Sequence, residues 1–153
     1  MSASRDGASP RIVAAVDGSA PSIAALRWAV NQAELTGGTV DAVIAWEYPY
    51  ATAGLGWMAV PLSEGTDYAE LAAKSLAEAI AEVSPPPGVT VHQIVVEGNP
   101  AQAILATAEH ADLLVVGKRG HGSFADALVG SVSVRCLHHA NCPVVVVHGS
   151  RQH

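Results

Sequence analysis

The feature that most constrains the fold is a regular alternation of short apolar runs and longer amphipathic segments. Five apolar runs of strand length occupy residues 11–19, 39–46, 89–98, 111–117 and 142–148. The segments between them carry apolar residues at helical spacing. Strands that alternate with helices form parallel sheets, because the chain must cross over the sheet between parallel neighbours. The pattern therefore predicts an α/β fold, a doubly wound parallel sheet with helices on both faces.

The helical segments also carry start and stop signals. Pro21 suits a first helical turn and Gly37 a helix stop, and Asn99 and Pro100 form a cap followed by a first-turn proline. Further helices are predicted over residues 66–83 and from Ser131 onward. The faces expected to point inward are Ile23, Leu26, Ala29, Val30 and Ala33 in the first helix, and Leu71, Leu76, Ala79, Ile80 and Val83 in the second.

Length and charge narrow the class of protein. The 153 residues suit one domain over 1–153, with 1–9 and 149–153 as loose tails. The formal charge of −6 argues against nucleic-acid and anionic-membrane partners, so an anionic ligand must be held by local features. The polar start resembles no signal peptide, and no apolar run is long enough to span a bilayer. We therefore expect a cytoplasmic protein.

One stretch after the fourth apolar run has an unusual composition. Residues 117–134 read GKRGHGSFADALVGSVSV, rich in glycine and serine, and lead into a helix. Glycines let the backbone approach a ligand, successive backbone N–H groups form an anion nest, and a helix N-terminus attracts phosphate. Neither a Walker loop nor the dinucleotide glycine motif is present. The stretch predicts a phosphate site, and the alternative is a plain connection packed tightly through small residues.

A second strand ends in a polar turn. The first apolar run closes at Asp17, and the fourth closes at Gly117. Ligands of open parallel sheets sit beyond the carboxyl ends of the strands, where the strand order reverses. If these two strands are neighbours, their ends form one crevice.

These residues carry a family resemblance. Gly117-x2-Gly120-x9-Gly130-Ser131 resembles the ATP-binding signature of the universal stress protein family. IVAAVDGS at residues 12–19 is similar to the first strand of that family, and residues 111–147 are similar to its last third. The resemblance implies a five-stranded, Rossmann-like sheet with the order 3-2-1-4-5, which places the first and fourth strands side by side.

The resemblance also implies a nucleotide site for ATP, with Mg. Asp17 would lie by the ribose or a metal-linked phosphate, and the backbone near Glu47 would face adenine. Val116 and Gly117 would line the base and ribose. The implied phosphate contacts, largely through the backbone, are Gly120, Gly130, Ser131, Val132 and Ser133. Lys118 departs from the family, where serine is common, and adds a cation that either helps the phosphates or faces solvent.

Other candidate residues have simpler explanations. The segment CLHHANC places Cys136, Cys142 and two histidines close together, but the spacing is no standard zinc pattern. Buried cysteine and exposed histidine are expected instead, with no metal ligated by protein side chains. His121 is expected to be an exposed loop residue, and the alternative is a contact with phosphate. Residues 47–65 form a long connection in which Trp57 and Met58 cover the base, pack on a partner or lie in disordered chain.

The function expected from these observations is that of an ATP-binding stress sensor or switch. No catalytic residues are predicted, because no paired-carboxylate or Ser-His-Asp pattern has supporting context. The alternatives are a slow ATPase or other adenine-nucleotide enzyme, and a cyclic-AMP binder on the same fold. The fifth strand would lie at a sheet edge and carries four uncharged valines, so a homodimer through that strand is also expected. The alternative is that the tail from Gly149 folds back and covers this edge within one chain.

Overall fold

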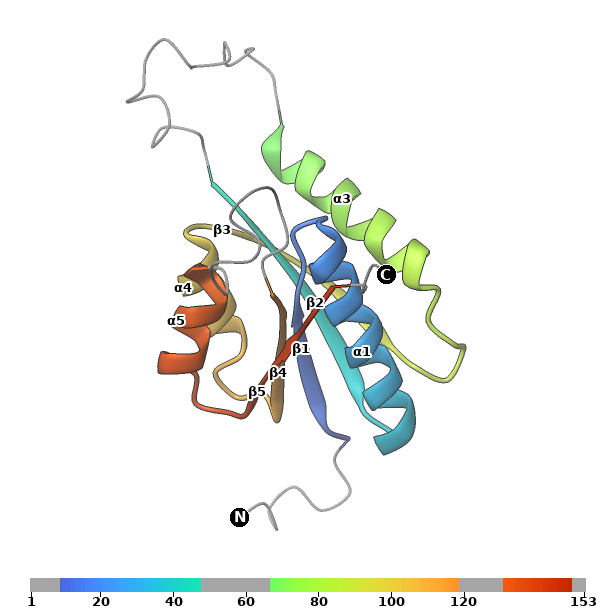
Figure 1. The fold of residues 1–153 in the computed structure, drawn as a ribbon. Helices are drawn as coiled ribbons and strands as arrows, with labels where there is room; N and C mark the ends of the chain where they lie inside the picture. Colours follow the sequence, from blue (N-terminus) through green and yellow to red (C-terminus); the bar gives the residue numbers. More distant parts are fainter. Residues whose placement is uncertain (1–8, 48–66, 119–130, 150–153) are drawn as a thin grey trace, which may run out of the picture.

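The computed structural model describes residues 9–47, 67–118 and 131–149 (Figure 1). Strands and helices alternate along this part of the chain, as predicted. Their bounds are β1 (Arg11–Ala15), α1 (Ala20–Thr36), β2 (Thr39–Trp46), α3 (Tyr68–Val83), β3 (Val91–Glu97), α4 (Pro100–Thr107), β4 (Leu113–Gly117), α5 (Ser131–His139) and β5 (Val144–Val147). The predictions for Trp57, Met58, Gly120, His121 and Gly130 concern residues outside the described ones, as do those for most of the two tails.

The five strands form one parallel sheet in the order β3-β2-β1-β4-β5, which confirms the predicted topology. β1 lies at the centre, with Ile12 opposite Val40 of β2 on one side and Leu113 of β4 on the other. The chain moves outward from β1 to β3 and then returns to the other side of β1. The strand order therefore reverses between β1 and β4, which makes this pair of strands the switch point of the sheet.

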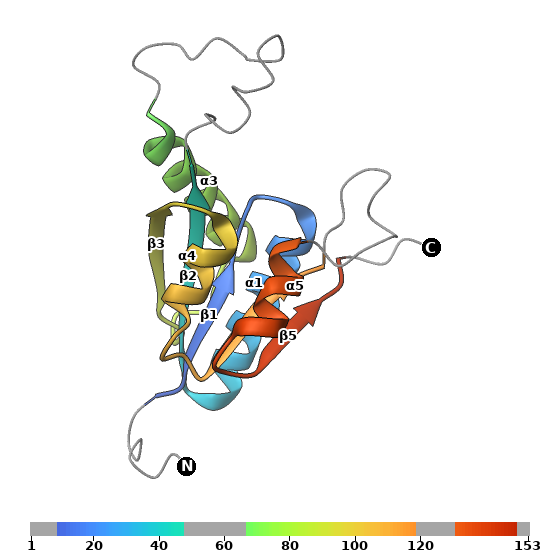
Figure 2. The ribbon, with the colours of Figure 1, turned by 90° about the vertical axis from the view of Figure 1, so that its left-hand side faces the viewer.

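Helices cover both faces of the sheet. Figure 2 shows α4 and α5 on one face and α1 and α3 on the other. Side chains of β1 alternate between the two layers: Ile12 and Ala14 pack under α1 and α3, and Val13 and Ala15 pack under α4 and α5. Both layers are small and aliphatic, which fits a chain that is half hydrophobic and poor in aromatic residues. None of the described helices is long and apolar enough to cross a membrane.

The helix end predicted at Gly37 and the helix start predicted at Asn99 and Pro100 are confirmed. Gly37 closes α1 in the left-handed conformation (φ 73°), and its N–H donates to the carbonyl of Ala33. Asn99 caps α4 by accepting from the N–H of Gln102, with Pro100 in the first turn. Asp67 caps α3 in the same way, accepting from the N–H of Glu70 at 3.0 Å. These caps satisfy helix-terminal groups that would otherwise need water.

The inward face of α3 differs from the prediction at one residue. Leu71 is 55% exposed, whereas Ala72, Leu76 and Ala79 are buried. Successive residues of a helix are turned by about 100° around its axis, so a stripe that begins at Ala72 leaves Leu71 on the rim. The prediction for Leu71 was therefore wrong, because a small alanine occupies the contact with the sheet that a larger leucine was expected to fill.

Candidate functional site

The candidate site begins where β1 and β4 end side by side. Pairing continues one residue past each strand: the N–H of Val16 donates to the carbonyl of Val43 at 2.8 Å, and the N–H of Lys118 donates to that of Val147 at 2.8 Å. Gly18 then turns the chain at φ 85°, a conformation that L side chains rarely adopt. Asp17 and Lys118 therefore follow the carboxyl ends of two neighbouring strands, as is needed if these ends form one crevice.

Short hydrogen bonds hold the turn between β1 and α1. The hydroxyl of Ser22 accepts from the N–H of Asp17 at 3.1 Å and donates to the carbonyl of Ser19 at 2.9 Å. The Asp17 carboxylate accepts from the N–H of Ser19 at 2.9 Å. Asp17 is nevertheless exposed. The Asp17 carboxylate therefore helps to fix the turn although the residue is exposed to solvent.

Gly117 has a packing role, and the sequence did not reveal its partner. A Cβ at this position would lie 2.5 Å from both the carbonyl carbon and the oxygen of Pro21, and 2.9 Å from the nitrogen of Ser22. The end of β4 thus lies directly against the backbone of the first turn of α1. This contact requires glycine with or without a ligand, and it joins the two halves of the site at the switch point.

The first turn of α5 is tied to the end of β4. Ser133 is only 4% exposed, and its hydroxyl donates to the carbonyl of Gly117 at 2.9 Å. A serine hydroxyl has a single hydrogen, so this side chain already donates its one bond. Val132 is half-buried against the layer beneath α4 and α5. Any phosphate contact by these residues would therefore use the N–H groups of the helix N-terminus, which starts at Ser131.

The remaining predicted residues flank this centre. Val116 is 2% exposed, so it lies in the core just before the end of β4. Glu47 is exposed directly after β2. Beside it the indole of Trp46 stacks on the ring of Tyr68, with centroids 6.5 Å apart and an interplanar angle of 22°. This pair joins β2 to α3 and was not predicted, because the two rings are distant in sequence and meet only when α3 packs against β2.

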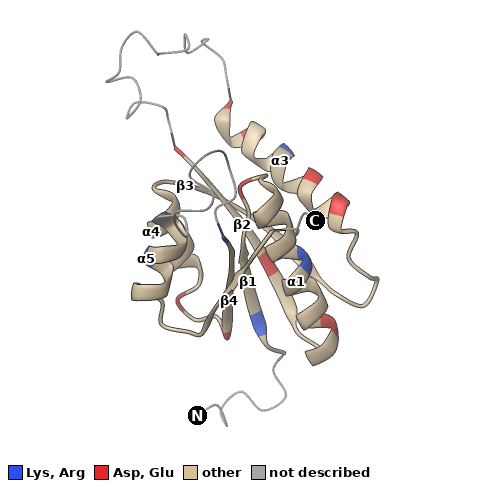
Figure 3. Ribbon diagram, viewed as in Figure 1, with Lys and Arg blue, Asp and Glu red and all other residues tan. Residues whose placement is uncertain are grey.

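The charges of the described residues are spread over the molecule rather than gathered at the site (Figure 3). A part-buried network that the sequence did not reveal lies at the amino ends of the strands, opposite the candidate site. Asp41 accepts from the Nε of Arg11 at 2.6 Å and lies 3.0 Å from the Nδ1 of His92. The guanidinium of Arg11 also donates to the carbonyl of Thr107, and its backbone N–H donates to Asp112. This network spans β1, β2, β3 and the end of α4.

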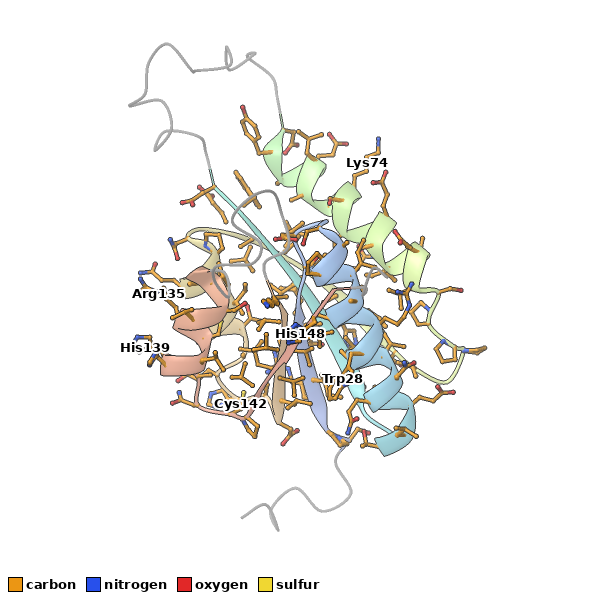
Figure 4. All side chains as sticks on the ribbon, in the orientation of Figure 1. Trp28, Lys74, Arg135, His139, Cys142 and His148 are labelled. Carbon is orange, nitrogen blue, oxygen red and sulfur yellow. The ribbon has the colours of Figure 1, made fainter. Side chains whose placement is uncertain are left out.

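The cysteines and histidines near the C-terminus form no metal site among the described residues. Cys136 is buried, and burial raises the pKa of its thiol from 9.0 to about 11, with Cys142 adding to the shift. Burial also raises the pKa of Cys142. His138 and His139 are exposed. Figure 4 places Arg135 and His139 on the side of α5 that points away from the sheet. The predicted burial is confirmed for Cys136, whereas Cys142 is only half-buried, and the predicted exposure of the two histidines is confirmed.

Comparison with known proteins identifies relatives over nearly the whole chain. Residues 9–148 match the model of the universal stress protein family. A universal stress protein of Mycolicibacterium smegmatis is 35% identical over 150 residues, covering 92% of this chain and 49% of the relative. A universal stress protein of Mycobacterium tuberculosis (strain H37Rv) is 33% identical over 146 residues, covering 90% of this chain and 47% of the relative. The chain thus spans about half the length of these relatives.

Solved structures of similar fold include nucleotide complexes. The universal stress protein of Archaeoglobus fulgidus in complex with dAMP aligns with a TM-score of 0.61 and 25% identity, covering 91% of this chain and 97% of that one. A universal stress protein in complex with cAMP aligns with a TM-score of 0.63 and 22% identity, covering 93% and 98%. The likeness to the second protein is one of fold.

Proposed function

The chain belongs to the universal stress protein family, and we propose that it binds ATP at the carboxyl ends of β1 and β4 and acts as a nucleotide-dependent stress sensor or switch. The observation that carries the proposal is the meeting of three features at the switch point: the Asp17 turn, the bare backbone of Gly117 and the N-terminus of α5. The dAMP complex of the Archaeoglobus fulgidus relative supports an adenine nucleotide as the ligand.

Each predicted residue has a role in this proposal. The Asp17 carboxylate contacts the ribose or an Mg-linked phosphate, and the backbone near Glu47 faces adenine. Val116 and Gly117 line the base and ribose. The phosphates are bound by N–H groups of the first turn of α5, at Ser131, Val132 and Ser133. Gly120 and Gly130 lie outside the described residues, and their assignment to the phosphates depends on the sequence signature.

Local features explain how an acidic chain can hold an anion. The formal charge is −6, so attraction of ATP by net charge is ruled out. The free N–H groups and the positive dipole end of α5 favour phosphate at its first turn. Lys118, half-buried directly after β4, supplies a cation to the same edge. Mg bound to the phosphates would offset the negative charge of Asp17.

The sensor role and a slow ATPase differ in turnover. We expect hydrolysis far below the median enzyme rate of about 10 per second, because the sequence offers no catalytic constellation. A robust ATPase that is lost in Asp17→Asn, with ATP binding retained, would make Asp17 catalytic and would replace the sensor by an enzyme.

A homodimer through β5 completes the proposal. β5 lies at a sheet edge, and all four of its valines are only half-buried. An edge strand without charge presents N–H and C=O groups that a second copy can pair through a two-fold axis. Light scattering tests this: the wild type is expected to be dimeric, and Val145→Pro, which removes a strand donor, is expected to be monomeric. A wild type that is monomeric at high concentration would exclude the dimer.

Calorimetry tests the nucleotide site. The wild type is expected to bind ATP more tightly than AMP, because AMP lacks the outer phosphates. Gly130→Val is expected to abolish ATP binding while leaving the fold intact. Gly88→Val is the matched control, since Gly88 is exposed in a turn and a Cβ there meets nothing within 4 Å. Equal affinities for ATP and AMP would reduce the site to one for adenosine monophosphate, and tighter binding of cAMP than ATP would favour the cyclic nucleotide.

A further inference from the structure

We propose that Ser133 is a positioning residue for the nucleotide. Its buried hydroxyl, donated to the carbonyl of Gly117, sets where the first turn of α5 lies relative to the end of β4, and thereby sets the affinity for the phosphates without touching them. This inference depends on the proposed function, because it concerns how the same site is held in its binding geometry.

The two ends of this hydrogen bond differ in how firmly they are fixed. Gly117 is held from several directions: it pairs with Val147 of β5, and it abuts the backbone of Pro21 in α1. Among the described residues, the first turn of α5 is held by the packing of Val132 against the layer beneath α4 and α5. The hydroxyl of Ser133 supplies a direct link of 2.9 Å from that turn to the fixed strand end.

Because Ser133 is buried, loss of its hydrogen bond to Gly117 is not readily compensated by water. Ser133 is 4% exposed, so water has little access to replace the hydroxyl as a donor to Gly117. Phosphate binding at a helix N-terminus depends on N–H groups that point at the ligand, and small displacements weaken it. Removal of the hydroxyl therefore lets the first turn of α5 shift away from the edge at which the phosphates bind.

A purely structural role for Ser133 makes a different prediction. If the hydrogen bond only stabilised the fold, Ser133→Ala would lower stability and leave the affinities of the folded protein for ATP and adenosine equal to those of the wild type. If the bond positions the first turn of α5, the loss is specific to phosphates. Adenosine, which has none, then keeps its affinity while ATP loses it.

The chain offers a matched control. The hydroxyl of Thr107 donates to the carbonyl of Ala103 at 2.8 Å, and this bond is also part-buried and also ends on a backbone carbonyl. Thr107 lies at the end of α4, and its backbone carbonyl accepts from Arg11 of the network around Asp41. Thr107→Val removes that hydroxyl at nearly constant volume. It should leave both affinities unchanged.

The experiment measures ATP and adenosine affinities by calorimetry, together with thermal unfolding, for the wild type, Ser133→Ala and Thr107→Val. We expect Ser133→Ala to weaken ATP binding about 10-fold, a free-energy change of about 1.4 kcal/mol, with adenosine changed less than about 2-fold. Ser133→Ala with wild-type ATP affinity, or with equal losses for both ligands, would overturn the inference.

Two further outcomes are kept distinct. A wild type that binds no ATP defeats the proposed function itself, whereas a wild type that binds ATP beside a Ser133→Ala variant of equal affinity defeats only this inference. If Ser133→Ala does not fold, the near-isosteric Ser133→Cys, whose thiol is a weak donor, is measured against the same two criteria.

Discussion

The amino ends of the strands form one end of the sheet, called here the amino edge, and their carboxyl ends form the other, called the carboxyl edge. Different kinds of interaction hold the chain at these two ends. At the amino edge the links are charged: Asp41, whose side chain is 11% exposed, accepts from Arg11 at 2.6 Å and contacts His92 at 3.0 Å. At the carboxyl edge, beside the Asp17 carboxylate that accepts from the N–H of Ser19, two neutral hydroxyls make the links between elements. Ser22 joins the start of α1 to the turn after β1, and Ser133 joins α5 to β4. The first set crosses three strands, and the second set fastens helix starts to strand ends.

This difference separates stability from binding. Removing Asp41 from this part-buried ion pair leaves the Arg11 guanidinium without its charged partner, so loss of this carboxylate is expected to destabilise the fold. A neutral hydrogen bond contributes only about 1 kcal/mol, so the carboxyl edge is held in place more weakly and can respond to a ligand. The contrast leads to the expectation that substitutions at the amino edge change stability alone, and that substitutions at the carboxyl edge change nucleotide affinity as well.

The largest expected loss of stability follows removal of the central carboxylate. Asp41→Ala leaves Arg11, which is 31% exposed, without its ion-pair partner, and we expect a loss of about 3 kcal/mol in the free energy of unfolding. ATP affinity of the folded protein should stay within about 2-fold of wild type. Urea unfolding and calorimetry measure the two quantities. His92→Ala is the control: His92 is 58% exposed, so we expect a change within about 0.5 kcal/mol. A loss of ATP affinity in Asp41→Ala would erase the contrast.

The next largest effect is expected where β4 meets α1. Gly117→Ala forces a methyl group against the backbone of Pro21, and overpacking of this kind costs about 2 kcal/mol. Because the strand end is also the edge of the site, ATP affinity should fall by about 10-fold. Gly88→Ala, at a position with no neighbour within 4 Å, should change stability by less than about 0.5 kcal/mol. Full stability in Gly117→Ala would contradict the packing role.

A smaller effect is expected in the turn after β1. Ser22→Ala removes the acceptor for the N–H of Asp17 and the donor to Ser19, and we expect a loss of about 1 kcal/mol in stability. ATP affinity should fall about 3-fold as Asp17 becomes less well placed. Thr36→Val removes an exposed hydroxyl bond within α1 and should affect neither quantity. Wild-type ATP affinity in Ser22→Ala would show that the turn does not position Asp17 for the ligand.

The weakest contrast concerns the two thiols beneath α5 and β5. Because burial raises the pKa of Cys136 to about 11, this thiol should resist iodoacetamide at pH 8, while the partly exposed Cys142 reacts slowly. The stabilising effect of the buried neutral thiol is complete below the ordinary pKa of 9.0 and is lost as pH rises through about 11. Peptide mass spectrometry identifies the modified residue. Modification of Cys136 before Cys142 would contradict its burial.

Much of the fold was predictable from local patterns. The alternation of apolar runs and helical segments is the βα repeat of the structure, and Gly37 and Asn99 end and begin helices as their residue types predict. Strand order was not predictable from periodicity. It came from the resemblance of residues 12–19 and 117–131 to a known family, and the structure confirms it.

The missed features depend on which elements become neighbours. Asp41 stands inside an apolar run and has no partner at helical or strand spacing, so only the parallel pairing of three strands brings Arg11 and His92 to it. The contact of Gly117 with Pro21 likewise joins residues almost a hundred positions apart. Ser133 was predicted at the site because the family resemblance implies it there, but the bond to Gly117 that occupies its hydroxyl requires the folded chain.

Backbone amide shifts during an ATP titration test the central claim most directly, because they report both edges of the sheet in one NMR experiment. We expect saturable shifts at Asp17, Gly117 and Ser133, and no change at Arg11 and His92. Absence of saturable shifts, or shifts centred on the amino edge, would contradict the placement of the nucleotide at the carboxyl ends of β1 and β4.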